Sequence, residues 1–102
     1  MIDFKNKVVL VTGGSRGLGR AMVEGFAQAG AKVIIVSRKS ENCQLLAQSI
    51  IEKGGEALAI GANTSDCAAL DHVVATSIDH FGRIDILINN AGINVAMGPL
   101  TD

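Results

Sequence analysis

The chain has 102 residues, of which 48% are apolar, and it carries a formal net charge of -1 at pH 7. This composition predicts one soluble, folded domain over residues 1–102, because it can bury enough apolar surface to offset the entropy cost of ordering. The absence of any run of Lys or Arg argues against binding to nucleic acid or to an anionic membrane. No apolar stretch reaches the roughly 20 residues that span a bilayer, and the start lacks the apolar core of a signal peptide, so we expect a cytoplasmic protein.

Short apolar runs alternate with stretches of helical spacing along the chain. The runs suit parallel strands buried on both faces, and only the last contains a charge, at Asp85; they cover residues 8–11, 33–36, 57–60 and 84–88. Between them, three predicted helices each have one apolar side: Leu18, Met22 and Phe26; Leu45, Leu46, Ile50 and Ile51; and Leu70, Val73, Val74, Ile78 and Phe81.

The ends of these helices have suitable cap residues. A glycine follows each helix, where a left-handed residue is expected: Gly30, Gly54 and Gly82. A hydroxyl side chain precedes the second and third helices, where an oxygen would accept from a free N–H group: Ser40, and either Thr64 or Ser65.

Strands that alternate with helices predict a parallel sheet with right-handed crossovers, in the strand order 3-2-1-4. Residues 92–102 contain the only proline and are expected to form a loop. In this arrangement, residues 84–88 would form an uncovered apolar edge. Because natural edge strands are short, charged or protected, we expect another strand or chain to pair with it.

The stretch VVLVTGGSRGLGRAM, residues 8–22, forms the first turn from strand to helix. Free N–H groups and the dipole at a helix start favour a phosphate there, and glycine lets the backbone come close to it. Gly17 and Gly19 begin the dinucleotide motif G-x-G-x-x-G, but Met22 stands where its third glycine should be. Arg20 likewise replaces the lysine of a P-loop.

A third motif, T-G-x-x-x-G-x-G, does fit the turn, at Thr12, Gly13, Gly17 and Gly19. Taken alone, it is also compatible with a plain tight turn. A second stretch, IDILINNAG at residues 84–92, ends a strand in two asparagines and a turn of small residues. The two motifs at this spacing resemble the short-chain dehydrogenase/reductase family, and the resemblance covers the whole chain.

The resemblance implies an α/β fold of the Rossmann type, a doubly wound parallel sheet that binds a nicotinamide dinucleotide across the carboxyl ends of its strands. It implies that the glycine turn lies against the pyrophosphate and the adenosine ribose, that residues 90–92 line the cofactor cleft, and that Thr12 and Asn89 are mainly structural. Asp85 would support the fold near the adenine. The predicted cofactor-binding residues are Gly13, Ser15, Arg16, Gly17, Leu18, Gly19, Ser37, Arg38, Asn63, Thr64, Asn90, Ala91 and Gly92.

The end of the second predicted strand bears on the choice of cofactor. Rossmann folds that select NAD place an Asp or Glu roughly 20 residues past the glycines, on the ribose 2′-hydroxyl. Here Ser37 and Arg38 stand in that place, and no carboxylate appears before Glu41. Arg16 would reach the same corner, and a guanidinium suits a phosphate, so we predict a preference for NADP(H). The alternative is that both arginines are ordinary solvated surface charges.

Asn63 departs from the family pattern. At its position, after the third strand, the family often has an Asp that accepts from the adenine amino group, and an amide oxygen can accept the same bond. His72 and His80 show no metal-ligand spacing, so no metal site is predicted.

The chain contains no tyrosine. The family transfers hydride with a Ser and with the Tyr and Lys of a Y-x-x-x-K motif, all downstream of the N-N-A-G turn, so no catalytic residue is assigned within residues 1–102. We therefore interpret the chain as the cofactor-binding half of a longer reductase.

Three functions stay open. The first is an NADP(H)-dependent oxidoreductase that acts on a small-molecule carbonyl or secondary alcohol. The second is a protein that binds a dinucleotide without catalysis, and the third is an interaction module that uses an open sheet edge. The resemblance further implies a homo-oligomer, a dimer or a tetramer.

Overall fold

The computed structural model describes residues 4–13, 17–38, 40–63, 66–89 and 94–97. In this part of the chain the strands are β1 (Val8–Thr12), β2 (Lys32–Ser37), β3 (Glu56–Gly61), β4 (Ile86–Asn89) and β5 (Asn94–Met97). The helices are α1 (Gly17–Gln28), α2 (Ser40–Glu52) and α3 (Cys67–Phe81). None of these helices combines the length and the apolar character of a membrane-spanning segment.

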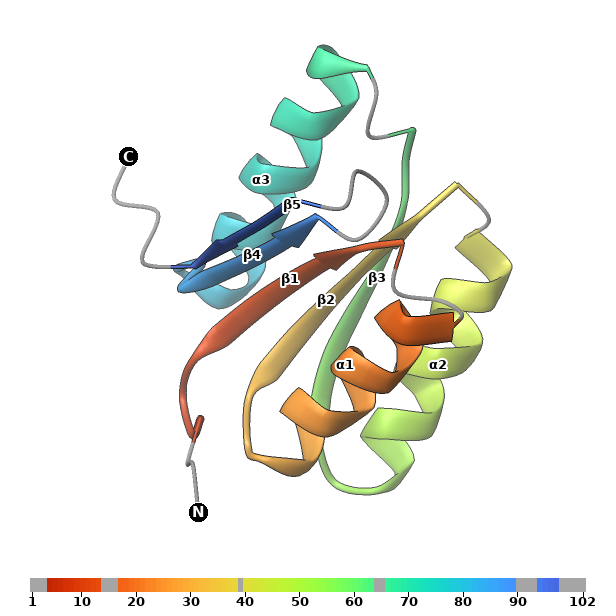
Figure 1. The fold of residues 1–102 in the computed structure, drawn as a ribbon, viewed down its shortest axis with the longest axis vertical. Coiled ribbons are helices and arrows are strands. Elements are labelled where there is room, and N and C mark those ends of the chain that lie inside the picture. Colours follow the sequence, from red (N-terminus) through yellow and green to blue (C-terminus); the bar gives the residue numbers. More distant parts are fainter. Residues whose placement is uncertain (1–3, 14–16, 39, 64–65, 90–93, 98–102) are drawn as a thin grey trace.

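The strands form one sheet in the order β3-β2-β1-β4-β5 (Figure 1). The pairs β1·β2, β2·β3 and β1·β4 are parallel, and β1 lies in the middle of the sheet. This arrangement confirms the predicted Rossmann-type α/β fold and the order 3-2-1-4 of its parallel strands.

Strand β5 was not predicted. It runs antiparallel to β4, with Asn89 opposite Asn94 and Ile86 opposite Met97. The expectation that residues 92–102 form only loop is therefore wrong for Asn94–Met97, and the apolar edge at β4 is covered by the chain itself. The open N–H and C=O groups along β4 explain the pairing, because a returning segment of the chain can satisfy them. An interaction module would therefore have to use β3 or β5, the outer strands of the described sheet, rather than β4.

Helices cover both faces of the sheet. The core on one face joins β1 to α1 and α2 through side chains such as Val9 and Val11, which are both 0% exposed. The core on the other face joins β1 to Val73 of α3 through Val8 and Leu10. Alternate residues of β1 thus enter opposite cores, which explains why its sequence is apolar throughout. Figure 1 shows α1 and α2 together on one side and α3 on the other.

Residues at the centre of each predicted apolar face are buried or half-buried, as expected, whereas some residues at its margins are exposed. On α2, Leu46 and Ile50 are each 5% exposed and pack in the core. The buried stripe of the helices is narrower than predicted, however, because four hydrophobic residues of the predicted apolar sides are exposed: Leu18, Leu45, Ile51 and Ile78. Residues adjacent to a buried position point about 100° away from it on a helix, which places Leu45 and Ile51 outside the contact with the sheet. Leu18 lies in the first turn of α1, where the helix reaches the end of the sheet.

The predicted glycine caps are confirmed, since Gly30, Gly54 and Gly82 all have positive φ angles. The N-cap of α3 is Asp66 rather than Thr64 or Ser65, and its carboxylate accepts a hydrogen bond from the N–H group of Ala68 at 3.0 Å. The prediction failed because the helix begins later than expected, and Asp caps a helix as well as Ser does.

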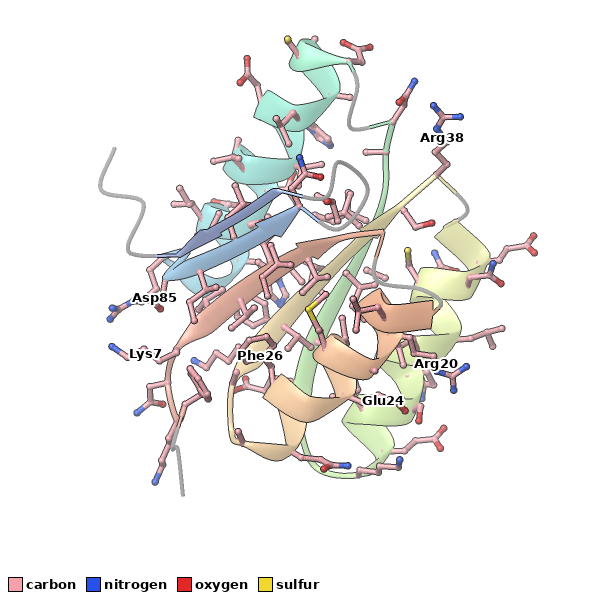
Figure 2. All side chains as sticks on the ribbon, in the orientation of Figure 1. Lys7, Arg20, Glu24, Phe26, Arg38 and Asp85 are labelled. Atoms are coloured by element: carbon pink, nitrogen blue, oxygen red, sulfur yellow. The ribbon has the colours of Figure 1, made fainter. Side chains whose placement is uncertain are left out.

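Asp85 joins β1 to β4 at the amino ends of these strands. Its carboxylate oxygen Oδ2 accepts from the N–H group of Val8 at 2.8 Å, and its own N–H group donates to the Val8 carbonyl at 2.8 Å. The other oxygen accepts from Arg83, with Nε at 2.9 Å. The resemblance placed Asp85 near the adenine; the structure places it beside Lys7, at the opposite edge of the sheet from Arg38 (Figure 2).

The Asp85 carboxylate is held in its charged form although it is only 8% exposed. Burial alone raises its pKa, but the hydrogen bonds from Arg83 and Val8, together with the positive charges of Arg83 and Lys7, outweigh that effect. The pKa is therefore below the ordinary value for an aspartate.

Replacing Asp85 with Ala should lower the free energy of unfolding by about 1–3 kcal/mol, because the buried N–H group of Val8 loses its acceptor. Urea denaturation followed by circular dichroism measures this loss. Asp79→Ala, at an exposed position on α3, is the control and should change little. Equal effects of the two variants would contradict the role assigned to Asp85.

Stability should depend on Asp85 in acid. A group whose pKa is lowered by folding contributes stability above its unfolded value, about 3.9 for Asp, and loses that contribution as the pH falls through its folded pKa. The wild type should therefore lose stability more steeply between about pH 5 and pH 2 than Asp85→Asn, which keeps an oxygen acceptor without the charge. If the free energy of unfolding fell equally with pH in the two proteins across this range, the Asp85 carboxylate would not contribute to the loss of stability in acid.

Candidate functional site

The carboxyl ends of four strands meet at one edge of the sheet, because β1, β2, β3 and β4 are parallel. After β1 the chain continues through α1 toward β2, whereas α3 carries it back across the sheet to β4. The strand order thus reverses between β1 and β4, with helices leaving on opposite faces. Open α/β sheets bind ligands in the crevice outside the strand ends at such a point, and the candidate site therefore lies at this edge.

Thr12 and Asn89 connect the ends of β1 and β4. The Thr12 hydroxyl donates to Oδ1 of Asn89 at 2.9 Å, and the Ile88 carbonyl lies 3.4 Å from the same hydroxyl. Thr12 is only 2% exposed, so this bond is shielded from water. The contact agrees with the structural roles predicted for both residues, and it ties the last residue of β4 to the last residue of β1.

The glycine turn departs from β1 in a conformation that favours glycine. Gly13 has a φ angle of 67° and donates its N–H group to the Val36 carbonyl at 2.7 Å. Gly17, where α1 begins, has a φ angle of 63°, and among the described residues, its chain neighbours and the backbone of its own helix aside, nothing lies within 4 Å of the point that a Cβ atom would occupy. An L side chain is strained at such angles.

The first turn of α1 lies at this edge because the helix starts immediately after the glycine turn. N–H groups at a helix start have no partner within the helix, and no acidic residue lies in the first turn of α1 to offset their positive potential. Gly19 is buried in this turn, whereas Leu18 is exposed to solvent. The arrangement can hold a phosphate or another anion.

Arg38 and Asn63 come together across the ends of β2 and β3. Ser37 of β2 is paired with Gly61 of β3, so the residues that follow the two strands are neighbours. The guanidinium atom Nη2 of Arg38 donates to Oδ1 of Asn63 at 3.4 Å, and both side chains are exposed. The sequence predicts contacts of these residues with separate parts of the cofactor, but it does not predict their contact with each other.

Cys43 of α2 packs against Ser37, the last residue of β2, directly before Arg38. Burial raises the pKa of the Cys43 thiol, and the hydrogen bond with Ser37 offsets this only in part. The group therefore stays a neutral thiol and part of the core.

All thirteen cofactor-binding assignments stay predictions. Six of these residues lie outside the described part of the chain: Ser15, Arg16, Thr64, Asn90, Ala91 and Gly92. Among the described residues, no three His, Cys, Asp or Glu side chains gather in a way that could hold a metal ion.

A cavity of about 290 Å³ lies elsewhere, between the C-terminal turns of α1 and α2. Its walls include Glu24, Gln28, Lys53 and Glu56, and none of the predicted cofactor-binding residues lines it. We assign the candidate site to the strand ends rather than to this cavity, because the strand reversal, the open helix start and Arg38 all lie there.

Residues 7–102 match the model of a protein family described as short chain dehydrogenase. The CLA biosynthesis dehydrogenase/reductase of Lactiplantibacillus plantarum is 42% identical over 93 residues, which are 91% of this chain and 32% of that protein. The 3-oxoacyl-[acyl-carrier-protein] reductase of Synechocystis sp. is 42% identical over 88 residues, 85% of this chain and 36% of that protein. The chain thus spans about a third of the length of these curated relatives.

Among solved structures, the 3-ketoacyl-(acyl-carrier-protein) reductase from Brucella melitensis, crystallised with NADH, superposes with a TM-score of 0.77. It is 38% identical in sequence, and the match covers 83% of this chain and 34% of that one. Since sequence and fold agree over most of its length, this chain belongs to the short-chain dehydrogenase family.

Proposed function

We propose that this chain holds NADP(H) for an oxidoreductase that transfers a hydride between the nicotinamide and a small-molecule carbonyl or secondary alcohol. Membership of the family supports the enzyme class and a nicotinamide cofactor. The observation that carries the preference for NADP(H) is Arg38 at the end of β2, in the place where NAD-selecting folds have a carboxylate.

The residues at the carboxyl edge fit such a cofactor. The start of α1 offers N–H groups to the pyrophosphate, and no described residue beyond the chain neighbours of Gly17 and the backbone of its helix lies within 4 Å of the point that a Cβ atom would occupy there. Arg38 provides a positive charge for the 2′-phosphate. The bound cofactor supplies the hydride chemistry, and the residues described here bind and orient it.

Acid–base catalysis of the family's type needs a tyrosine, and the chain contains none. We therefore assign cofactor binding to these residues and hydride transfer to an enzyme of which they form the cofactor-binding domain. Binding without catalysis is the alternative function. A homo-oligomer and a cytoplasmic location stay predictions.

Arg38→Ala should weaken the binding of NADPH about tenfold and leave the binding of NADH unchanged, because a charged hydrogen bond to the 2′-phosphate is lost. Fluorescence titration of the wild type and the variant with both cofactors measures the change. Arg20→Ala is the control, since Arg20 pairs with Glu24 on α1 and should not affect selectivity. Wild-type protein that binds NADH as well as NADPH would refute the preference.

Thr12→Val should weaken the binding of both cofactors alike, by roughly fivefold, because the loss of one hydrogen bond of about 1 kcal/mol loosens the link to Asn89. The same titrations measure it, with Thr76→Val on α3 as a control for the exchange of a hydroxyl for a methyl group. A loss confined to one cofactor would show that Thr12 does not act through the shared part of the site.

A further inference from the structure

We propose that Asn63 determines cofactor specificity by positioning Arg38: its neutral amide holds the guanidinium at the carboxyl edge and leaves the positive charge available to a 2′-phosphate. This inference rests on the proposed binding of NADP(H). It gives Asn63 a different role from the one that the family resemblance implies, namely a contact with the adenine.

The backbone brings the two side chains together. The N–H group of Ala62 donates to the Ser37 carbonyl at 2.9 Å, which continues the pairing of β2 and β3 past the end of β3. Arg38 and Asn63 therefore follow adjacent strand ends that are held in register, and their side chains meet at 3.4 Å. Figure 2 shows Arg38 extending beyond the end of β2 at this edge.

The chemistry of the pair fixes the orientation of the amide. A guanidinium group only donates hydrogen bonds, so the amide atom that faces Arg38 must be the oxygen. This is the oxygen that the family resemblance assigns to the adenine amino group, and in the structure it accepts from Nη2 of Arg38.

The other described arginines show what a charged partner does. Arg20 pairs with Glu24, and Arg83 pairs with Asp85, so a carboxylate already balances each guanidinium. Arg38 forms no ion pair with any carboxylate in the described part of the chain, and its contact is the neutral amide of Asn63. An amide can orient a guanidinium without competing for its charge, whereas a carboxylate would pair with it and repel an incoming phosphate.

The test is a calorimetric titration of the protein with two probes, adenosine 5′-monophosphate and adenosine 2′,5′-bisphosphate. Asn63→Asp should weaken binding of the bisphosphate about tenfold, the size of one charged hydrogen bond, and leave the monophosphate unchanged. Asn63→Ala should weaken only the bisphosphate, by a smaller factor. Gln28→Glu adds the same charge at the C-terminal end of α1, remote from Arg38, and should alter neither affinity.

A double-mutant cycle tests whether Asn63 acts through Arg38. In an Arg38→Ala background, Asn63→Ala should have no further effect on binding of the bisphosphate, because the group that it positions is already absent. Additive losses would overturn the inference. Circular dichroism of each variant confirms that the exposed substitutions leave the fold intact.

The two probes separate the failure of this inference from the failure of the proposed function. If Asn63→Ala weakens both probes equally, Asn63 contacts the adenine, and the inference fails while cofactor binding stands. If the wild type binds both probes equally, the preference for the 2′-phosphate fails and the inference fails with it. If the wild type binds neither, the proposed function itself is wrong.

Discussion

The position of β1 in the middle of the sheet, with helices packed on both faces, is the constraint on which the rest of the structure depends. Its polar backbone groups are shielded from water along its whole length, so each one needs a partner. Asp85 supplies the partner at the amino end, and Thr12 links the carboxyl end to Asn89. The edge that holds the glycine turn is therefore aligned by contacts at both ends of one buried strand.

Much of the fold follows from the sequence because burial on both faces leaves a plain signal. Residues 8–11 are apolar throughout, and their alternate members enter opposite cores, as an unbroken apolar run predicts. The features that the sequence does not predict correctly have physical explanations. Strand β5 has four residues and owes its pairing to the edge of β4, which a local pattern does not reveal. Leu18 continues the helical period of α1, but it is exposed in the first turn of the helix, beside the buried Gly19.

The sequence predicts the separate segments of the candidate site, but it does not predict the contacts between their side chains. The glycine spacing and the absence of a carboxylate between Ser37 and Glu41 are visible in the sequence, because each depends on one segment of chain. The pairing of Arg38 with Asn63 joins residues 25 positions apart, and it depends on the register of β2 and β3 at their ends. Asp85 was predicted to lie near the adenine, and its contact with Val8 was not predicted, for a related reason. The position of Asp85 in the sequence does not reveal which backbone groups of β1 need an acceptor.

The β4–β5 hairpin has a consequence for how the chain folds. Its two strands are close neighbours in the sequence, whereas Val8 must find Asp85 across 77 residues. Hairpins form in about 1–10 μs, and long-range parallel pairing is much slower. The hairpin can therefore form while the chain still searches for β1, and it occupies one of the two edges of β4 during that slower step.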